Sequence, residues 1–412
     1  LTNKYGDNIF SSNKGTGLEV ITNGSVQMNG INSDSNAQYG VRIDNTGGSG
    51  SVKLKNVMTS NNNLGGLWVT SKGSIALDHV NAGYNNVAAD AFGAILDNSF
   101  AGASGSVSLT NSLGSSSFNG NKATGLTIRS NRSISVRGIS TYYNKGFGME
   151  LVNSSGSGAI SIIKVEAYDN VLGGIQATAR GNITLTEGSA RENDTFGVNL
   201  VTLGSGNVSI NQLDTSSNDN GHGLIVNAAG SILITDLSST YNEGASSNGV
   251  YLDNSSVVKP VTIKKKNFYI NNLSHNASGS GIEIHTLGAV TLDGISAYSN
   301  GSYGVHLDNP GSTGSLVMKN FGVYNNFNDN LLLISQGGAS LTDGTLDNST
   351  VGNGAQIEIH TGNGSASFTR VAFNDNNQHG LLLTSAGSVT LTNCEALRNV
   401  THYGARIDNT AG

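Results

Sequence analysis

Five Asp-Asn dipeptides recur at one position of a repeated turn, and this column of carboxylates is the arrangement in the sequence that most suggests a bound cation. The dipeptides fall on every second turn of the repeat at best, so successive carboxylates lie about 9–10 Å apart. Two ligands of one calcium ion lie within about 5 Å of each other, because each is about 2.4 Å from the ion. We therefore predict that these aspartates cap turns, and that the chain binds no metal or other cofactor. The five are Asp44, Asp97, Asp253, Asp308 and Asp408.

A basic run at Lys264, Lys265 and Lys266 is the second candidate for chemistry. Successive residues of a strand point to opposite faces, so Lys264 and Lys266 share one face and Lys265 lies on the other. A binding surface for an acidic polysaccharide is one interpretation. The sequence favours the other interpretation, a charged strand at an inserted and bulging turn.

The elements that position these residues come from a repeat that runs along the whole chain. Each copy begins with a glycine followed by an apolar, a variable and an apolar residue, and the copies start 23 to 32 residues apart. A sustained period of this length is typical of a solenoid. The starts are Gly17, Gly40, Gly66, Gly93, Gly125, Gly148, Gly174, Gly197, Gly223, Gly249, Gly281, Gly304, Gly354, Gly380 and Gly404, with Asn330 once in the glycine place.

Short stretches within each copy, such as "SVKLKNV" and "SIALDHV", alternate apolar and polar residues, as a strand with one buried face does. The pattern predicts coils of about 25 residues with two or three parallel strands each, the third being shorter. Short turns such as "VITNGSV" alternate with longer ones such as "IDNTGGSGSV". The two longest intervals, after Gly93 and after Gly249, carry extra residues that we expect to protrude.

Asparagine stands four residues before the glycine position in ten of the sixteen copies. Asparagine tolerates the left-handed backbone conformation, and amides at the same corner of successive coils can hydrogen-bond to one another. We predict an internal asparagine ladder in preference to a binding face. The ten are Asn13, Asn36, Asn62, Asn121, Asn144, Asn170, Asn193, Asn300, Asn326 and Asn376.

With this repeat and this column of amides, the sequence resembles right-handed parallel β-helix proteins, the architecture of pectate lyases and of many bacterial surface adhesins. The resemblance covers the whole chain and is specific for fold, not for function. We expect an all-β, right-handed parallel β-helix solenoid of about sixteen coils. Residues 1–412 should form a single domain, since no linker divides them.

The tripeptide Gly221-His222-Gly223 is similar to a motif of polygalacturonases, which share that architecture. Inverting hydrolysis also requires a carboxylic acid and a water-activating carboxylate, and the sequence contains no Asp-Asp pair. His222 is better interpreted as the variable residue before a repeat glycine, with a contact to carbohydrate as the alternative.

Composition and charge restrict the partners. A net charge of −6 argues against nucleic-acid binding, and no apolar run is long enough for a membrane span. The one cysteine, Cys394, has no second cysteine to pair with. Only 12 % of residues are charged and 56 are glycine, which fits a thin, repetitive β core better than a helical protein or a disordered one.

The regularity predicts a non-enzymatic, extracellular or cell-surface rod with a structural or adhesive role. A β-helical carbohydrate-active enzyme, lyase or hydrolase, and a carbohydrate-binding stalk are the alternatives. The last residues, "GARIDNTAG", match "GVRIDNTGG" at 40–48, and joining residue 412 to residue 1 would give an interval of 8 + 17 = 25 residues between repeat glycines. We therefore expect the partners to be further copies stacked head to tail or adjoining repeats of a longer array, with glycans as a further class.

Overall fold

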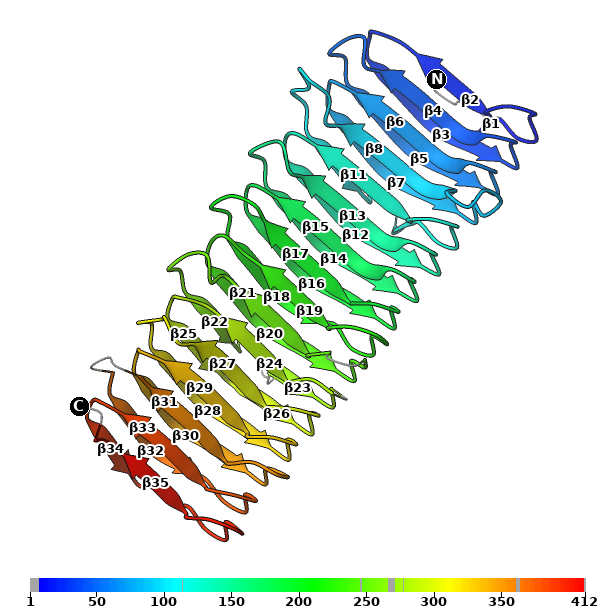
Figure 1. Ribbon diagram of the computed structural model, residues 1–412. Coiled ribbons are helices and arrows are strands. Elements are labelled where there is room, and N and C mark those ends of the chain that lie inside the picture. Colours follow the sequence, from blue (N-terminus) through cyan, green and yellow to red (C-terminus); the bar gives the residue numbers. More distant parts are fainter. Residues whose placement is uncertain are drawn as a thin grey trace. The chain divides into compact units, whose positions relative to one another are not determined.

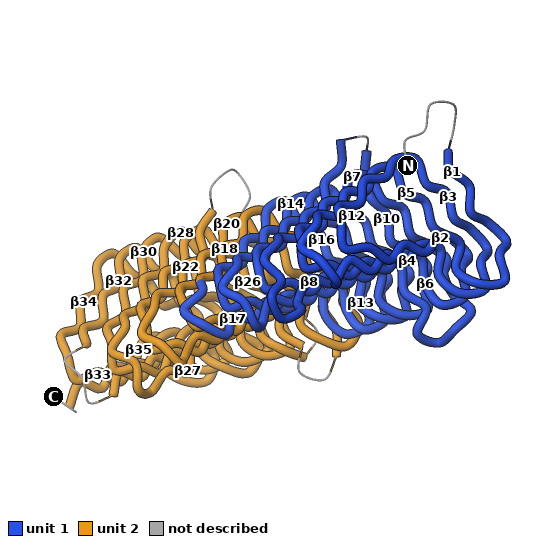
Figure 2. Tube along the Cα trace, turned by 90° about the horizontal axis from the view of Figure 1, so that it is seen from above, with its two compact units in different colours: residues 1–206 blue, residues 207–412 orange. Residues whose placement is uncertain are grey.

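The computed structural model describes residues 7–112, 114–244, 247–265, 271–276, 278–360 and 364–410. The chain divides into two compact units, residues 1–206 and 207–412 (Figure 2). All regular elements in the described ranges are β-strands, and each unit is a parallel β-solenoid. The two faces of each coil are called sheet A and sheet B below.

Unit 1 winds between these two sheets, and each coil contributes a strand to both (Figure 1). Neighbouring strands within each sheet are parallel, so each coil pairs with the next one in register. Sheet A contains β1 (Asn8–Ile9), β3 (Val26–Asp34), β5 (Val52–Ser60), β7 (Ile75–Gly83), β9 (Val107–Thr110), β10 (Ser116–Ser117), β12 (Ile134–Tyr142), β14 (Ile160–Tyr168) and β16 (Ile183–Arg191). Sheet B contains β2 (Leu18–Ile21), β4 (Tyr39–Asn45), β6 (Gly65–Ser71), β8 (Phe92–Asn98), β11 (Leu126–Ser130), β13 (Phe147–Asn153), β15 (Gly173–Ala179) and β17 (Val198–Thr202).

Unit 2 repeats this plan, again with parallel pairing in both sheets. Sheet A contains β18 (Val208–Asp214), β20 (Ile232–Thr240), β22 (Val261–Lys264), β23 (Asn271–Ser274), β25 (Val290–Asp293), β26 (Ile295–Tyr298), β28 (Leu316–Tyr324), β30 (Ala339–Asp347), β32 (Ala366–Ala372) and β34 (Val389–Thr392). Sheet B contains β19 (Leu224–Asn227), β21 (Val250–Asp253), β24 (Ile282–His285), β27 (Val305–Asn309), β29 (Leu331–Ser335), β31 (Ala355–Ile359), β33 (Leu381–Ser385) and β35 (Ala405–Asp408).

The predicted all-β, parallel β-helix fold is confirmed, with about fifteen turns in place of the sixteen coils expected. No helix long and apolar enough to cross a membrane occurs in the described ranges. The core follows the sequence alternation, as β5 illustrates: Val52, Leu54 and Val57 are buried, whereas Lys53 and Lys55 point outward.

The second and third strands predicted for each coil are in most coils one strand of up to nine residues with a bend at its centre. The bend is a single residue with positive φ, for example Asn56 at 51° and Lys164 at 54°. One left-handed residue turns the chain, and the parallel pairing skips that residue and resumes in register after it, so inward residues on both sides of the bend reach the same core. In the coil of β25 and β26 the bend residue is Gly294, and there the two strands are separate.

The asparagine ladder is present in both units. In unit 1 each Nδ2 donates to the Oδ1 of the next asparagine over 2.8–3.3 Å, from Asn13 to Asn193. Nine of the ten predicted asparagines are buried, and Asn13 is exposed although it makes the same bond. The ladder also includes residues that the spacing did not select, because extra residues separate them from the next glycine: Asn85, Asn218, Asn242, Asn276 and Asn399.

The ladder explains why the repeat begins with glycine. A Cβ on Gly148 would lie 2.8 Å from Nδ2 of Asn170 and 2.7 Å from the carbonyl oxygen of Gly174, both in the next coil. Asn330 departs from the rule where the ladder position of the next coil is a serine, Ser349. Its own amide fills the gap, accepting a bond from Asn326 at 2.8 Å and donating to Asn376 at 3.2 Å.

Candidate functional site

Four aspartates of the longer turns, Asp44, Asp97, Asp253 and Asp408, act as caps in the structure, whereas Asp308 is followed two residues later by Pro310, which has no N–H to donate. Asp44 Oδ1 accepts hydrogen bonds from the backbone N–H of Thr46 at 3.0 Å and from its hydroxyl at 2.7 Å. Asp253 caps Ser255 in the same way. Within the described ranges, no group of three or more histidine, cysteine, aspartate or glutamate side chains is arranged to hold a metal ion.

The structure separates the residues proposed from the sequence as carbohydrate contacts. Lys264 is exposed at the end of β22 in sheet A, in register with Asp293. His222 immediately precedes the glycine that leads into β19 of sheet B. Lys266 lies outside the described residues.

His222 belongs to a group of titratable side chains on the outer face of sheet B in unit 2. Its Nδ1 accepts a hydrogen bond from the backbone N–H of Asn248 at 3.0 Å, which leaves Nε2 to carry the proton of the neutral ring. Asn248 is itself fixed, because its Oδ1 accepts the N–H of Ser280 at 2.8 Å. The His222 ring is thus held in one orientation and one tautomer by the next coil.

Glu283 is connected to His222 through the same asparagine. Its two carboxylate oxygens accept Nδ2 of Asn248 and Nε2 of His285, both at 2.8 Å. The carboxylate is half-buried and aligned by these two donors.

Tyr251 and His306 complete the group, which we call the histidine cluster: His222, Asn248, Tyr251, Glu283, His285 and His306. Tyr251, Glu283 and His306 occupy one register position on the adjacent strands β21, β24 and β27. The Tyr251 ring centroid is 5.6 Å from that of His222 and 5.5 Å from that of His285. The cluster therefore extends over four neighbouring coils, or about 14 Å at the usual strand spacing.

Burial and hydrogen bonding set the charges of the cluster. Burial lowers the pKa of His222 and of His306, so both rings are neutral at pH 7. Burial alone would raise the pKa of Glu283, but the hydrogen bonds from His285 and Asn248 outweigh it and hold the pKa below its ordinary value. Burial also raises the pKa of Tyr251. The cluster thus presents a carboxylate, the neutral imidazoles of His222 and His306, and a neutral phenol.

A second buried carboxyl group lies on the same face. Asp329 precedes β29, and its Oδ1 accepts the backbone N–H of Asn353 at 2.5 Å and its side-chain amide at 3.0 Å. Burial raises the pKa of Asp329 more than these bonds lower it. The pKa values of Asp329 and Glu283 are therefore shifted in opposite directions.

Sequence reasoning selected His222 and missed the rest of the cluster. Tyr251, Glu283 and His306 each stand two residues after a repeat glycine, at an outward position that the apolar pattern leaves undetermined. Comparing that position across all coils would not have singled them out, because Thr127, Glu150, Gln176 and Asn199 form a longer polar run there in unit 1. The cluster is shared among several coils, so no single copy of the repeat reveals it.

Comparisons with known proteins give little beyond the fold. No protein-family model matches the chain, and no curated protein matches it. Among solved structures it is similar to A-modules of two mannuronan C-5 epimerases of Azotobacter vinelandii. The AlgE6 module is 13 % identical with a TM-score of 0.38, covering 87 % of this chain and 91 % of the module. The AlgE4 module is 13 % identical with a TM-score of 0.41, covering 82 % and 88 %. These similarities carry no argument about what this chain binds.

Proposed function

We propose that this chain is a carbohydrate-binding β-solenoid of an extracellular surface, and that the histidine cluster binds an extended glycan. The observation that supports the proposal is the placement of ring-bearing and hydrogen-bonding side chains on successive strands. Rings stack on the apolar faces of sugars, and fixed carboxylate and imidazole groups bond their hydroxyls. A ligand that contacts the whole cluster must extend across four coils.

The charge of the cluster favours a neutral glycan. Glu283 is ionised and the imidazoles of His222 and His306 are neutral, so a polyanionic chain would meet a negative charge. This makes the proposal specific enough to test with paired ligands of equal length, one neutral and one acidic.

Calorimetry with neutral oligosaccharides selected on a glycan array tests the proposal. Tyr251→Ala and Glu283→Gln should each weaken binding about tenfold, while the thermal transition stays close to that of the parent. Gln176→Ala is the matched control, because Gln176 occupies the equivalent outward position of β15 in unit 1. Unchanged affinity in both cluster variants would contradict the proposal.

A second candidate function is an enzyme acting on the same glycan. It is favoured by the opposite pKa shifts of Asp329 and Glu283, the condition for a proton donor and a proton acceptor on one surface. Release of new reducing ends or unsaturated products from a bound glycan would support it. Asp329→Asn should then abolish turnover and leave glycan binding intact. If the parent protein binds the glycan without turnover, the result favours the carbohydrate-binding role over the enzyme.

A structural role through coil-on-coil stacking forms part of the proposal. Within each unit every coil pairs in register with the next one in both sheets, and this pairing is the mode by which a coil of a second copy or of an adjoining repeat would stack. Electron microscopy of native material tests whether stacked copies form a filament. Surface labelling of intact cells tests whether the protein lies on the cell surface. Dispersed particles confined to the cell interior would contradict both.

A further inference from the structure

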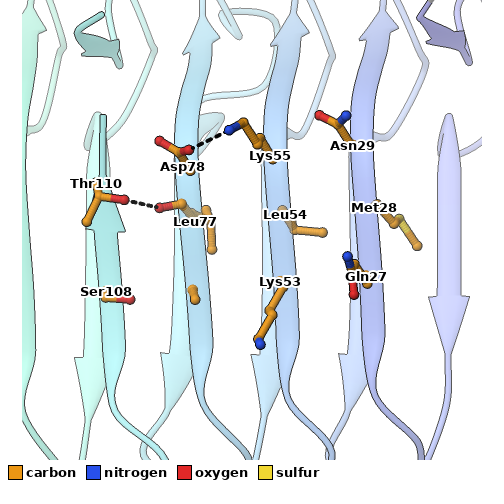
Figure 3. Close-up of a pocket in the computed structure, with 11 residues that line it drawn as sticks. Gln27, Met28, Asn29, Lys53, Leu54, Lys55, Leu77, Asp78, Ser108 and Thr110 are labelled. Atoms are coloured by element: carbon orange, nitrogen blue, oxygen red, sulfur yellow. Dashed lines mark hydrogen bonds and ion pairs between the residues drawn. The ribbon is translucent and has the colours of Figure 1, made fainter. Parts of the chain in front are cut away.

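A hollow crosses sheet A in unit 1, on strands remote in sequence from the histidine cluster. It has a volume of about 400 Å³ and lies over β3, β5, β7 and β9 (Figure 3). Gln27, Lys53, Ala76 and Ser108 form one row of outward side chains in register across these four strands. The methyl group of Ala76 makes the floor low between Lys53 and Ser108.

One lining residue of the hollow, Asp78, is held by the residues that break the repeat. After β9 the chain carries the extra residues of the long interval, and Ser112 there donates its backbone N–H to Asp78 Oδ1 at 2.7 Å and its hydroxyl to Asp78 Oδ2. Lys55 Nζ lies 3.2 Å from Asp78 and 3.4 Å from the Ser112 hydroxyl. The insertion is thereby tied down against β7, and insertions in repeat proteins are where binding surfaces are commonly built.

The charges in the hollow leave one lysine uncompensated. Burial would raise the pKa of Asp78, but hydrogen bonds from Ser112 and Lys55 hold it below the ordinary value, so Asp78 is ionised and balances Lys55. Within the part of the chain that the structure describes, Lys53 has no carboxylate within ion-pair distance. The hollow therefore has a net positive charge on a chain whose overall charge is −6.

We propose that this hollow binds an acidic saccharide, with Lys53 as the partner of its carboxylate or sulfate group. The volume falls in the range of ligand sites and exceeds what a bare anion fills. Ser108 and Asn29 line the hollow as hydrogen-bonding partners for sugar hydroxyls. The site is independent of the glycan surface proposed for unit 2, and the two prefer ligands of different charge.

Calorimetry on the full chain tests the proposal with four probes: a uronic-acid oligosaccharide, a sulfated oligosaccharide, a neutral oligosaccharide of the same length, and inorganic sulfate. At least one acidic oligosaccharide should bind, and more weakly as salt is added. Lys53→Met should weaken that binding about tenfold. Lys122→Met removes an exposed lysine elsewhere in unit 1 and should have no effect.

Three outcomes would overturn the proposal: no binding of either acidic oligosaccharide, equal binding by the parent and by Lys53→Met, or equal affinity for inorganic sulfate, which would mean an adventitious ion only. Ala76→Leu fills the floor of the hollow without changing its charge and should also weaken binding. Tyr251→Ala in unit 2 should leave it unchanged, which separates this site from the histidine cluster.

Discussion

The outer face of sheet B has the same register in the two units, yet it carries different chemistry in each. In unit 1, Tyr39, Trp68 and Phe92 form an aromatic group with ring centroids 5.2–6.3 Å apart, and Arg42 lies 5.5 Å above the Trp68 ring. In unit 2 the corresponding positions carry the histidine cluster. The inward residues specify the coil, so outward residues can change from one coil to the next at little cost to the fold.

The inner ladders of the two units differ as well. Unit 1 has one asparagine in every coil from Asn13 to Asn193, whereas unit 2 has Ser349 in one ladder place and Asn330 in the glycine place of the preceding coil. A missing amide is thus replaced from a neighbouring position. The ladder tolerates a change of residue only when every buried polar group keeps a partner.

The largest effect is expected in the uninterrupted ladder of unit 1. Asn144 is fully buried, donates to Phe118 O at 2.9 Å and to Asn170 Oδ1 at 2.9 Å, and accepts from Asn121. Asn144→Leu leaves these partners unpaired and should lower the free energy of unfolding by about 1–3 kcal/mol. Chemical denaturation measures the change, and a variant as stable as the parent would contradict the structural role of the ladder.

A smaller loss, and its rescue, are expected in unit 2. Asn330→Gly removes the bridging amide and should cost about 1 kcal/mol. Adding Ser349→Asn should restore the regular arrangement of glycine and ladder asparagine, and with it the stability. Ser349→Asn alone should destabilise, because the new amide would meet the Asn330 side chain. A double-mutant cycle with additive effects would contradict the compensation.

The smallest effect is expected on mild acidification, and it should distinguish the units. The folded pKa values of His222 and His306 lie below the ordinary 6.5, so at lower pH the unfolded chain binds more protons than the folded one. Their stabilising contribution is complete above pH 6.5 and declines as the pH falls below it. Hydrogen exchange corrected for intrinsic rates should show protection lost in β19–β27 before β4–β8.

Unit 1 provides the internal reference for this measurement, since it contains a single histidine, His79. The combined variant His222→Gln, His306→Gln should reduce the pH dependence in unit 2. Equal loss of protection in both units, or an unchanged pH profile in the variant, would show that the cluster does not set the acid sensitivity.

The sequence by itself determined the fold of this chain. The glycine period, the two-residue alternation and the asparagine column are local regularities, and each coil buries its apolar residues only by stacking on the next, so the period specifies a parallel β-helix. The sequence also predicted that the aspartates of the Asp-Asn dipeptides cap their turns. The sequence did not reveal the bend within most sheet A strands, because Asn56, Lys164 and Glu187 in the bend position share no residue type, only a positive φ.

The candidate sites were decided by the tertiary structure. Tyr251, Glu283 and His306 are separated by more than twenty residues in sequence, and strand pairing alone makes them neighbours. The same holds for Lys53, Ala76 and Ser112, where an insertion in one coil folds back on the strand of another. Inward residues repeat because every coil packs against the same core. Outward residues form a site only together with the side chains of the neighbouring coils, and strand pairing decides which side chains those are.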